Sequence, residues 1–243
     1  SALATRLEGR GARHATGIVA LGDPTFVPGP RGADGADGIA AAIVQANGLP
    51  ELPQTAAEIA VLSALAGGRP LATLTGRDAT RDRLLALAEL PHPALIHVAT
   101  HGEANEVEPE RSGLWLAAAE NDSTPGFVSV SDILNLRLDA DLVTLSACET
   151  GLGKIERGEG VIGLTRAFLA AGARSVMVSL WKVNDRSTAL RMEEFYRRLL
   201  RDDTTAAIAL ARAKRVLLGR AATRSPFYWA PFVLVGSAGR LGG

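Results

Sequence analysis

The stretch ADLVTLSAC, from Ala140 to Cys148, is a run of strand-forming residues that is apolar at both alternating sets of positions. A strand with that pattern is buried on both faces, as strands of parallel sheets are. It ends on Cys148, the only cysteine of the 243 residues, and the acidic residue Glu149 follows at once. This stretch therefore predicts a central strand of a parallel sheet with a thiol at its carboxyl end.

Strand and helix patterns alternate on both sides of this stretch. Further strands are predicted over Thr16–Pro24, Leu71–Gly76, Ala94–Gly102, Arg174–Trp181 and Phe232–Gly236. Helices are predicted over 52–68, 79–90 and 161–172, and two more begin at about Ser187 and Thr204. A short hairpin is predicted from the pair of segments Ser112–Ala117 and Gly126–Ile133. Strands that alternate with amphipathic helices favour an α/β fold, with a mostly parallel sheet between helices.

The domain organisation follows from where these patterns begin and where glycines accumulate. A single domain is predicted over 16–243, preceded by an extension over 1–15. Residues 29–38, GPRGADGADG, have too few apolar side chains to pack, so we expect a flexible insertion there. The first residue is Ser1, which is typical of a processed product or a fragment.

The composition excludes several classes of protein. Lys plus Arg (26) equals Asp plus Glu (26), which gives no support to a nucleic-acid surface or a basic membrane contact. No apolar run approaches the roughly 18 residues of a membrane span. A single cysteine forms no internal disulfide, and together with the absence of a signal-like start this indicates a soluble cytoplasmic protein.

Polar residues follow three of the predicted strands, in HVATHG, LSACETG and LWKVND. They place His101 and Cys148 at strand ends and Asp185 shortly after one. Because functional residues of open parallel sheets gather at the carboxyl ends of strands, we expect these three at one edge of the sheet. His97 lies inside its strand instead, which indicates a buried, hydrogen-bonded structural histidine.

A cysteine peptidase needs a thiolate, a histidine to activate it, and donors for the oxyanion. His101 and Cys148 are 47 positions apart, each at a strand end, so adjacent strands would bring them within reach. The backbone N–H groups of Gly102 and Cys148 are the candidate oxyanion donors. However, free cysteines at the ends of apolar strands are more often core residues, and on spacing alone the two readings are equal.

Two acidic residues are candidates for binding a substrate side chain. Asp185 would hold a basic residue by charge, although its place before a helix slightly favours the role of N-cap instead. Glu149 lines the cleft or faces solvent. The chain lacks the phosphate-loop, dinucleotide-binding and G-x-S-x-G motifs and any metal-ligand spacing, so we expect neither a cofactor nor a metal.

The THG motif, Thr100 to Gly102, belongs to a wider pattern. IHVATHG, LVTLSACETGLG, GEGVIGLTRAFLAAGARSVMVSLWKVND and MEEFYRRLL resemble the CHAT domain, a family of caspase- and separase-like cysteine peptidases. The resemblance extends from the GDP turn near Asp23 to WAPFVLVG near the end of the chain. It implies a caspase-like α/β sheet with helices on both faces, and a catalytic dyad of His101 and Cys148. It also implies a basic P1 residue, held by Asp185 first and Glu149 second.

The resemblance implies a cysteine endopeptidase that cleaves a protein partner, with a bacterial defence effector or a pore-forming protein as the predicted target. Family members often follow tetratricopeptide repeats, so an upstream repeat domain or another activating partner is expected outside this chain. The alternative is a catalytically silent module of the same fold that binds a peptide in the same cleft. Retention of both His101 and Cys148 disfavours that alternative.

Overall fold

The computed structural model describes residues 17–26, 49, 52–69, 71–90, 92–103, 105, 108–118, 126–146, 148–149, 159–181, 185–202, 204–237 and 239–242. For Cys148, Glu149 and Asp185 it describes the backbone. The predicted extension over 1–15 and the glycine-rich insertion over 29–38 lie outside these residues and stay predictions.

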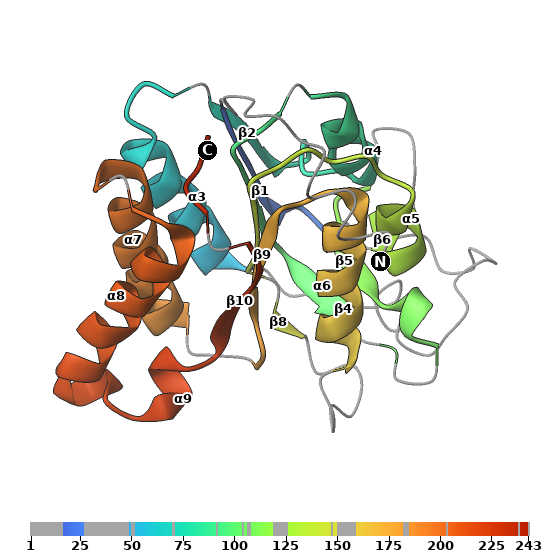
Figure 1. Cartoon of the computed structure of the whole chain (residues 1–243). Helices are drawn as coiled ribbons and strands as arrows, with labels where there is room; N and C mark the ends of the chain where they lie inside the picture. The colour runs from blue at the N-terminus through green and yellow to red at the C-terminus, as the bar shows by residue number, and fades with distance from the viewer. Residues whose placement is uncertain are drawn as a thin grey trace.

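A six-stranded sheet runs through the middle of the molecule (Figure 1). Its strands are β1 (Ile18–Pro24), β2 (Leu71–Gly76), β3 (Leu95–Ala99), β7 (Leu142–Leu145), β9 (Ser175–Ser179) and β10 (Phe232–Gly236). They lie in the order β10-β9-β7-β3-β1-β2, and every neighbouring pair is parallel except β9 with β10. The prediction of a mostly parallel sheet is therefore confirmed, with β7 near its centre.

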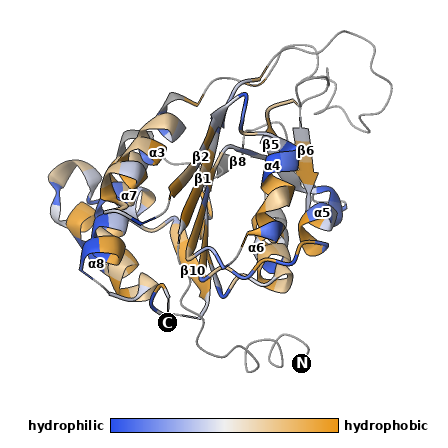
Figure 2. Ribbon diagram, turned by 90° about the horizontal axis from the view of Figure 1, so that it is seen from above, coloured by the Kyte–Doolittle hydropathy of each residue, from blue (hydrophilic) through white to orange (hydrophobic). Residues whose placement is uncertain are grey.

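Helices cover both faces of this sheet, as predicted (Figure 1). One layer holds α3 (Pro53–Leu65), α7 (Asp185–Arg201) and α8 (Ala206–Gly219), and the other holds α4 (Arg81–Leu85), α5 (Val130–Leu134) and α6 (Glu159–Ala171). Single turns occur at η1 (Ala86–Glu89), η2 (Pro109–Arg111), η3 (Ala221–Thr223) and α9 (Pro226–Trp229). Seen from above, the apolar strands stand between the two layers (Figure 2).

The side chains of the central strands are divided between two apolar cores. In β3, Ile96 and Val98 face the core shared with α6, whereas Leu95 faces the core shared with α3, α7 and α8. Phe168 of α6 fills the first core and is 1% exposed. Burying a side chain of this size contributes about 1.5–3 kcal/mol, which explains why strands apolar on both faces form the centre of the fold.

A second, four-stranded sheet was not predicted as a unit. It consists of β4 (His101–Glu103), β5 (Gly113–Leu116), β6 (Gly126–Ser129) and β8 (Cys148–Glu149), in the order β6-β5-β4-β8. β5 and β6 are antiparallel, in agreement with the predicted hairpin-like pair. β4 continues the chain one residue after β3, and β8 continues it after β7, so the small sheet extends two strands of the large one.

The start of α3 differs from the sequence pattern. Thr55 and Glu58 have the spacing of a capping box, but the helix begins at Pro53 with Leu52 as its N-cap. The Thr55 hydroxyl donates a hydrogen bond to the Leu52 carbonyl at 2.7 Å, from within the first turn. Glu58 is 3% exposed and points into the protein. Proline at the first helical position is the stronger start signal here.

Candidate active site

The register of the small sheet places the two candidate catalytic residues opposite each other. β4 and β8 are parallel neighbours, in which His101 pairs with Cys148 and Gly102 pairs with Glu149. Both strands leave the carboxyl ends of β3 and β7, which are themselves parallel neighbours. The structure therefore brings His101, Gly102, Cys148 and Glu149 together at the edge of the sheet where the sequence pattern placed them.

The His101 imidazole is buried beside aromatic rings. His101 is 1% exposed, and the centroid of its ring lies 5.4 Å from that of Phe26, with 42° between the planes. Trp115 is the register partner of His101 on β5, and its ring lies 4.7 Å from that of Phe127. Because little water reaches a wall of this kind, charges that form beside His101 interact more strongly than they would in solvent.

Glu103 is a carboxylate beside the site that the sequence analysis missed. It lies two residues after His101 in β4, and alternation along a strand puts both side chains on the same face. The Trp115 indole N–H donates to Glu103 Oε2 at 2.8 Å. Strand alternation could have identified Glu103, whereas the contact of Phe26 with His101 joins distant segments and leaves no local pattern.

Gly113, the register partner of Glu103, makes room for this arrangement. A Cβ atom at Gly113 would lie 2.4 Å from the Val128 carbonyl oxygen and 2.5 Å from Cζ of Phe127. Both distances are far below van der Waals contact, so a glycine is required for the Phe127 ring to lie over β5.

Hydrogen bonds fix the two segments that connect the large sheet to the small one. The Thr100 hydroxyl, between β3 and β4, donates to the carbonyl oxygen of Trp115. On the neighbouring strand, the Ser146 N–H donates to the Val98 carbonyl at 2.8 Å. The backbone that carries the candidate dyad is therefore tied to both sheets.

Beyond its last residue pair with β7, Leu145 with Val178, strand β9 continues toward an apolar surface. Leu180 and Trp181 follow it and are 39% and 38% exposed. The Trp181 indole N–H donates to the Phe227 carbonyl of α9 at 3.2 Å, and Phe227 is itself 49% exposed. This surface lies at the carboxyl end of β9, at the same edge of the sheet as His101.

The structure places Asp185 at the first residue of α7 and Glu149 opposite Gly102. An acid in the first helical turn interacts favourably with the helix dipole, so the capping interpretation of Asp185 stays open beside the substrate-binding one.

Within the described ranges, no three His, Cys, Asp or Glu side chains gather as metal ligands would. None of the helices described there is both long and apolar enough to cross a membrane.

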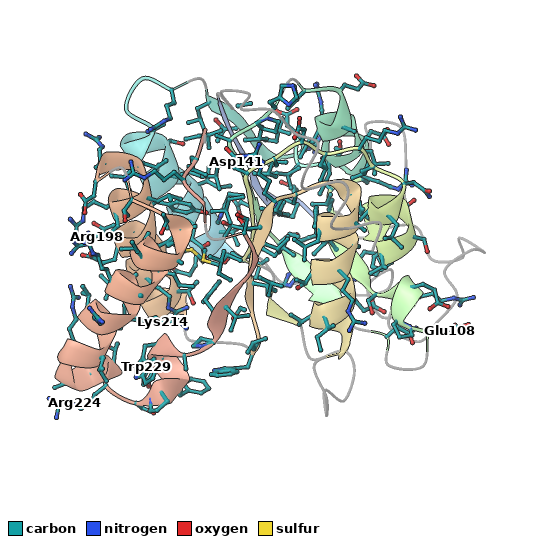
Figure 3. All side chains as sticks on the ribbon, viewed as in Figure 1. Glu108, Asp141, Arg198, Lys214, Arg224 and Trp229 are labelled. Carbon is teal, nitrogen blue, oxygen red and sulfur yellow. The ribbon has the colours of Figure 1, made fainter. Side chains whose placement is uncertain are left out.

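Charges are unevenly distributed over the molecule. Residues 204–243 contain six Arg and Lys and no Asp or Glu, while the whole chain balances 26 against 26. Figure 3 shows Lys214 and Arg224 on the side of α8 and Glu108 on the opposite side of the molecule. Burial, and to a smaller extent the charge of Arg191, lowers the pKa of Lys214. The remaining chain, which includes the candidate site, carries the excess of acid.

Comparison with known proteins identifies the family. The CHAT domain model matches residues 2–237. The human tetratricopeptide repeat protein 28 is 30% identical over 217 residues, which cover 76% of this chain and 8% of that protein. Its mouse counterpart is 38% identical over 110 residues, covering 45% of this chain and 4% of that protein. The chain thus spans less than a tenth of the curated relatives it matches.

Solved structures with the same fold include two peptidases. Separase, from the Saccharomyces cerevisiae separase–securin complex, matches with a TM-score of 0.52 and 11% identity, over 97% of this chain and 13% of that one. The Arg-specific cysteine proteinase gingipain R matches with a TM-score of 0.54 and 11% identity, over 95% of this chain and 50% of that one. Both are caspase-like cysteine peptidases, and at this identity the likeness shows the fold. With a caspase-like fold and a family match over nearly its whole length, the chain belongs to the CHAT domain family.

Proposed function

We propose that this chain is a cysteine endopeptidase with His101 as general base and Cys148 as nucleophile. The observation that supports this most directly is the register of β4 and β8, in which the two residues are direct partners. Neighbouring strands lie about 4.8 Å apart, a separation that an imidazole and a thiol can bridge. Membership of a family related to cysteine peptidases agrees with this assignment.

In the proposed reaction, His101 takes the proton of the Cys148 thiol and the thiolate attacks the scissile carbonyl carbon. The resulting oxyanion accepts hydrogen bonds from the backbone N–H groups of Gly102 and Cys148. Collapse of this intermediate breaks the C–N bond, and the leaving amine takes the proton from His101. A water molecule, deprotonated by His101, then hydrolyses the thioester and restores the thiol.

The proposed substrate has a basic P1 residue. Asp185 is the first candidate for its binding and Glu149 the second, and Glu103, two residues after His101 in β4, is a third. The fold neighbour gingipain R is itself Arg-specific.

The proposed substrate is a protein, and an activating domain outside this chain is proposed to control cleavage. The curated relatives are repeat proteins by name and far longer than this chain, and separase was solved with a protein partner. Activation of a bacterial defence effector or pore-forming protein, and a cytoplasmic location, stay predictions.

A peptidyl acyloxymethyl ketone with arginine at P1, which alkylates the nucleophile of cysteine peptidases, tests the proposal. We expect stoichiometric labelling of the wild-type chain and none of Cys148→Ala. His101→Ala should slow labelling by about 10²–10⁴-fold, the usual contribution of a general base. Asp185→Ala should slow labelling by the arginine probe more than by a leucine probe.

The matched control is His92→Asn. His92 lies at the other end of β3 and has a φ of 43°, a conformation that asparagine tolerates. This variant should label as the wild type does. If the folded wild-type chain takes no label, alone or together with a proposed activating domain, the silent peptide-binding module is the better assignment.

A further inference from the structure

A chain of buried polar side chains crosses the otherwise apolar core between the large sheet and the layer of α3 and α7. His97 of β3 is 0% exposed, and its Nδ1 lies 2.7 Å from the hydroxyl oxygen of Tyr196 on α7. The other ring nitrogen, Nε2, lies 3.4 Å from Oε2 of Glu58 on α3. Burial raises the pKa of the Tyr196 phenol, the adjacent Thr144 hydroxyl opposes that shift, and the Glu58 charge adds to it.

This network is the polar exception in two apolar strands. The residues on either side of His97 and Thr144 in β3 and β7 are all aliphatic and at most 1% exposed. A shift of β3 by two residues against β7 would exchange one aliphatic contact for another. It would, however, take His97 away from the Tyr196 hydroxyl, which lies beside Thr144, so the polar contacts of Tyr196 distinguish the observed register from the shifted one. Buried polar residues set the register of helices in coiled coils in the same way.

The same register reaches the candidate dyad. His97 pairs with Thr144 in the large sheet, and His101 pairs with Cys148 in the small one. Three residues separate the two positions on each strand, 98–100 on one and 145–147 on the other. Whatever fixes His97 opposite Thr144 therefore also fixes His101 opposite Cys148.

We propose that Glu58, His97, Thr144 and Tyr196 form a register clamp, whose role is to hold the strand of His101 in line with the strand of Cys148. They are positioning residues, because they lie in the core of α3 and α7 and act through the two strands. The structural part of this inference concerns backbone register alone. Its chemical consequence, a correctly placed dyad, rests on the proposed peptidase function.

Two helices contribute to the clamp from opposite ends of the chain. Tyr196 packs edge-on against His97, with ring centroids 5.6 Å apart and 79° between the planes. Glu58 approaches from α3, which packs beside α7 in the same layer (Figure 1). The clamp therefore forms only when both helices have docked on the sheet, which couples the register at the site to the packing of that layer.

The test uses Tyr196→Phe and Thr144→Val, which remove a hydroxyl group and keep the shape of the side chain. The first readout is the set of nuclear Overhauser contacts between the backbones of 101–102 and 148–149, which reports register without any chemistry. The second is the rate of alkylation of Cys148 by iodoacetamide as a function of pH, which reports how strongly His101 activates the thiol.

We expect wild type to show one set of cross-strand contacts and the clamp variants to show weakened or doubled sets. We also expect their alkylation at pH 6.5 to fall by about tenfold, because misplacement of His101 returns the thiol pKa toward its ordinary value near 8.5. The control, Leu217→Ala, empties a buried position of α8 that lies outside the core cluster containing Tyr196. It should lower thermal stability at least as much and leave both readouts as in wild type.

The two readouts separate the clamp from the dyad. If the clamp variants keep the wild-type cross-strand contacts and the wild-type alkylation profile, the clamp proposal is wrong. The network then contributes to stability but does not set the strand register. If wild type shows the contacts but its alkylation profile matches that of His101→Ala, the peptidase proposal fails. The cross-strand contacts of Tyr196→Phe and Thr144→Val then still decide whether the clamp exists.

Discussion

The large and small sheets differ in the length of their strands and in the side chains that those strands carry. Strands of the large sheet have four to seven residues, and its central members bury aliphatic side chains on both faces. Strands of the small sheet have two to four residues, and β4 carries a histidine, a glycine and an acid in succession. The large sheet can lose one contact among many, whereas the small sheet depends on a few specific ones. Stability and chemistry are therefore expected to respond to different substitutions.

The largest effect on stability is expected in the large sheet's core. Phe168→Ala should lower the free energy of unfolding by about 3–5 kcal/mol, because it removes a buried aromatic side chain and leaves a cavity. Chemical denaturation measures this change. The control is Phe227→Ala, which truncates a phenylalanine that is 49% exposed and should cost less than about 0.5 kcal/mol. Equal losses in the two variants would remove the contrast between core and surface on which this expectation depends.

A smaller and more local effect is expected in the small sheet. Gly113→Ala should lower the free energy of unfolding by about 1–3 kcal/mol, because its Cβ would overlap the Phe127 ring and the Val128 carbonyl. Displacement of Phe127 should also change the near-ultraviolet circular dichroism of Trp115, against which its ring packs.

Gly163→Ala in α6 is the matched glycine control. A Cβ there would meet the Pro109 carbonyl oxygen and Cγ2 of Val130 at 3.7 Å, an ordinary contact. It should stabilise the protein by about 0.5–1 kcal/mol, since alanine is the better helix former. An unchanged Trp115 signal in Gly113→Ala would show that the small sheet adjusts more freely than its packing indicates.

The smallest effect is expected where the small sheet joins α5. Asp132 accepts hydrogen bonds from the Ser129 backbone N–H and from Arg81 of α4, at 2.9 and 2.8 Å. Partial burial acts to raise the pKa of Asp132, but these hydrogen bonds and the Arg81 charge hold it below its ordinary 3.8. Its stabilisation is therefore present above pH 3.8 and is lost as pH falls through the lowered folded-state pKa.

Asp132→Asn should cost about 0.5 kcal/mol at pH 7, since the ion pair is partly exposed, and almost nothing below the folded-state pKa. Thermal unfolding across this pH range measures the difference. Asp82→Asn is the control, because Asp82 also lies near Arg81, at 3.8 Å, but is 76% exposed. The same pH dependence in both variants would mean that the contacts with Ser129 contribute nothing.

The large sheet could be predicted because its strands carry their own signal. Predominantly apolar runs such as LVTL and SVMVS indicate burial on both faces, whatever their neighbours are. The small sheet could not, since the two residues of β8 are too few to show any periodicity. Its pairing with β4 depends on the parallel alignment of β3 with β7, which is a property of the assembled fold.

Residues of the candidate site divide in the same way. The position of His101 and Cys148 after strands was visible, and their direct pairing agrees with the prediction of adjacent strands. The role of Glu58 had no local signal, because its spacing from Thr55 is typical of a capping box whereas its burial near His97 depends on tertiary packing. The burial of His97 was predicted correctly, since a lone histidine inside an aliphatic strand needs a partner.

The parallel pairing of β3 with β7 also constrains when the site can exist during folding. Parallel strands cannot be joined by a tight turn, and these two are separated by β4, the small hairpin and α5. Contacts between such distant segments form slowly, because the entropy of closing the long loop is lost before any pairing compensates for it. His101 and Cys148 therefore become neighbours only after the intervening chain has folded. On the proposed function, a partly synthesised chain would carry an unactivated thiol.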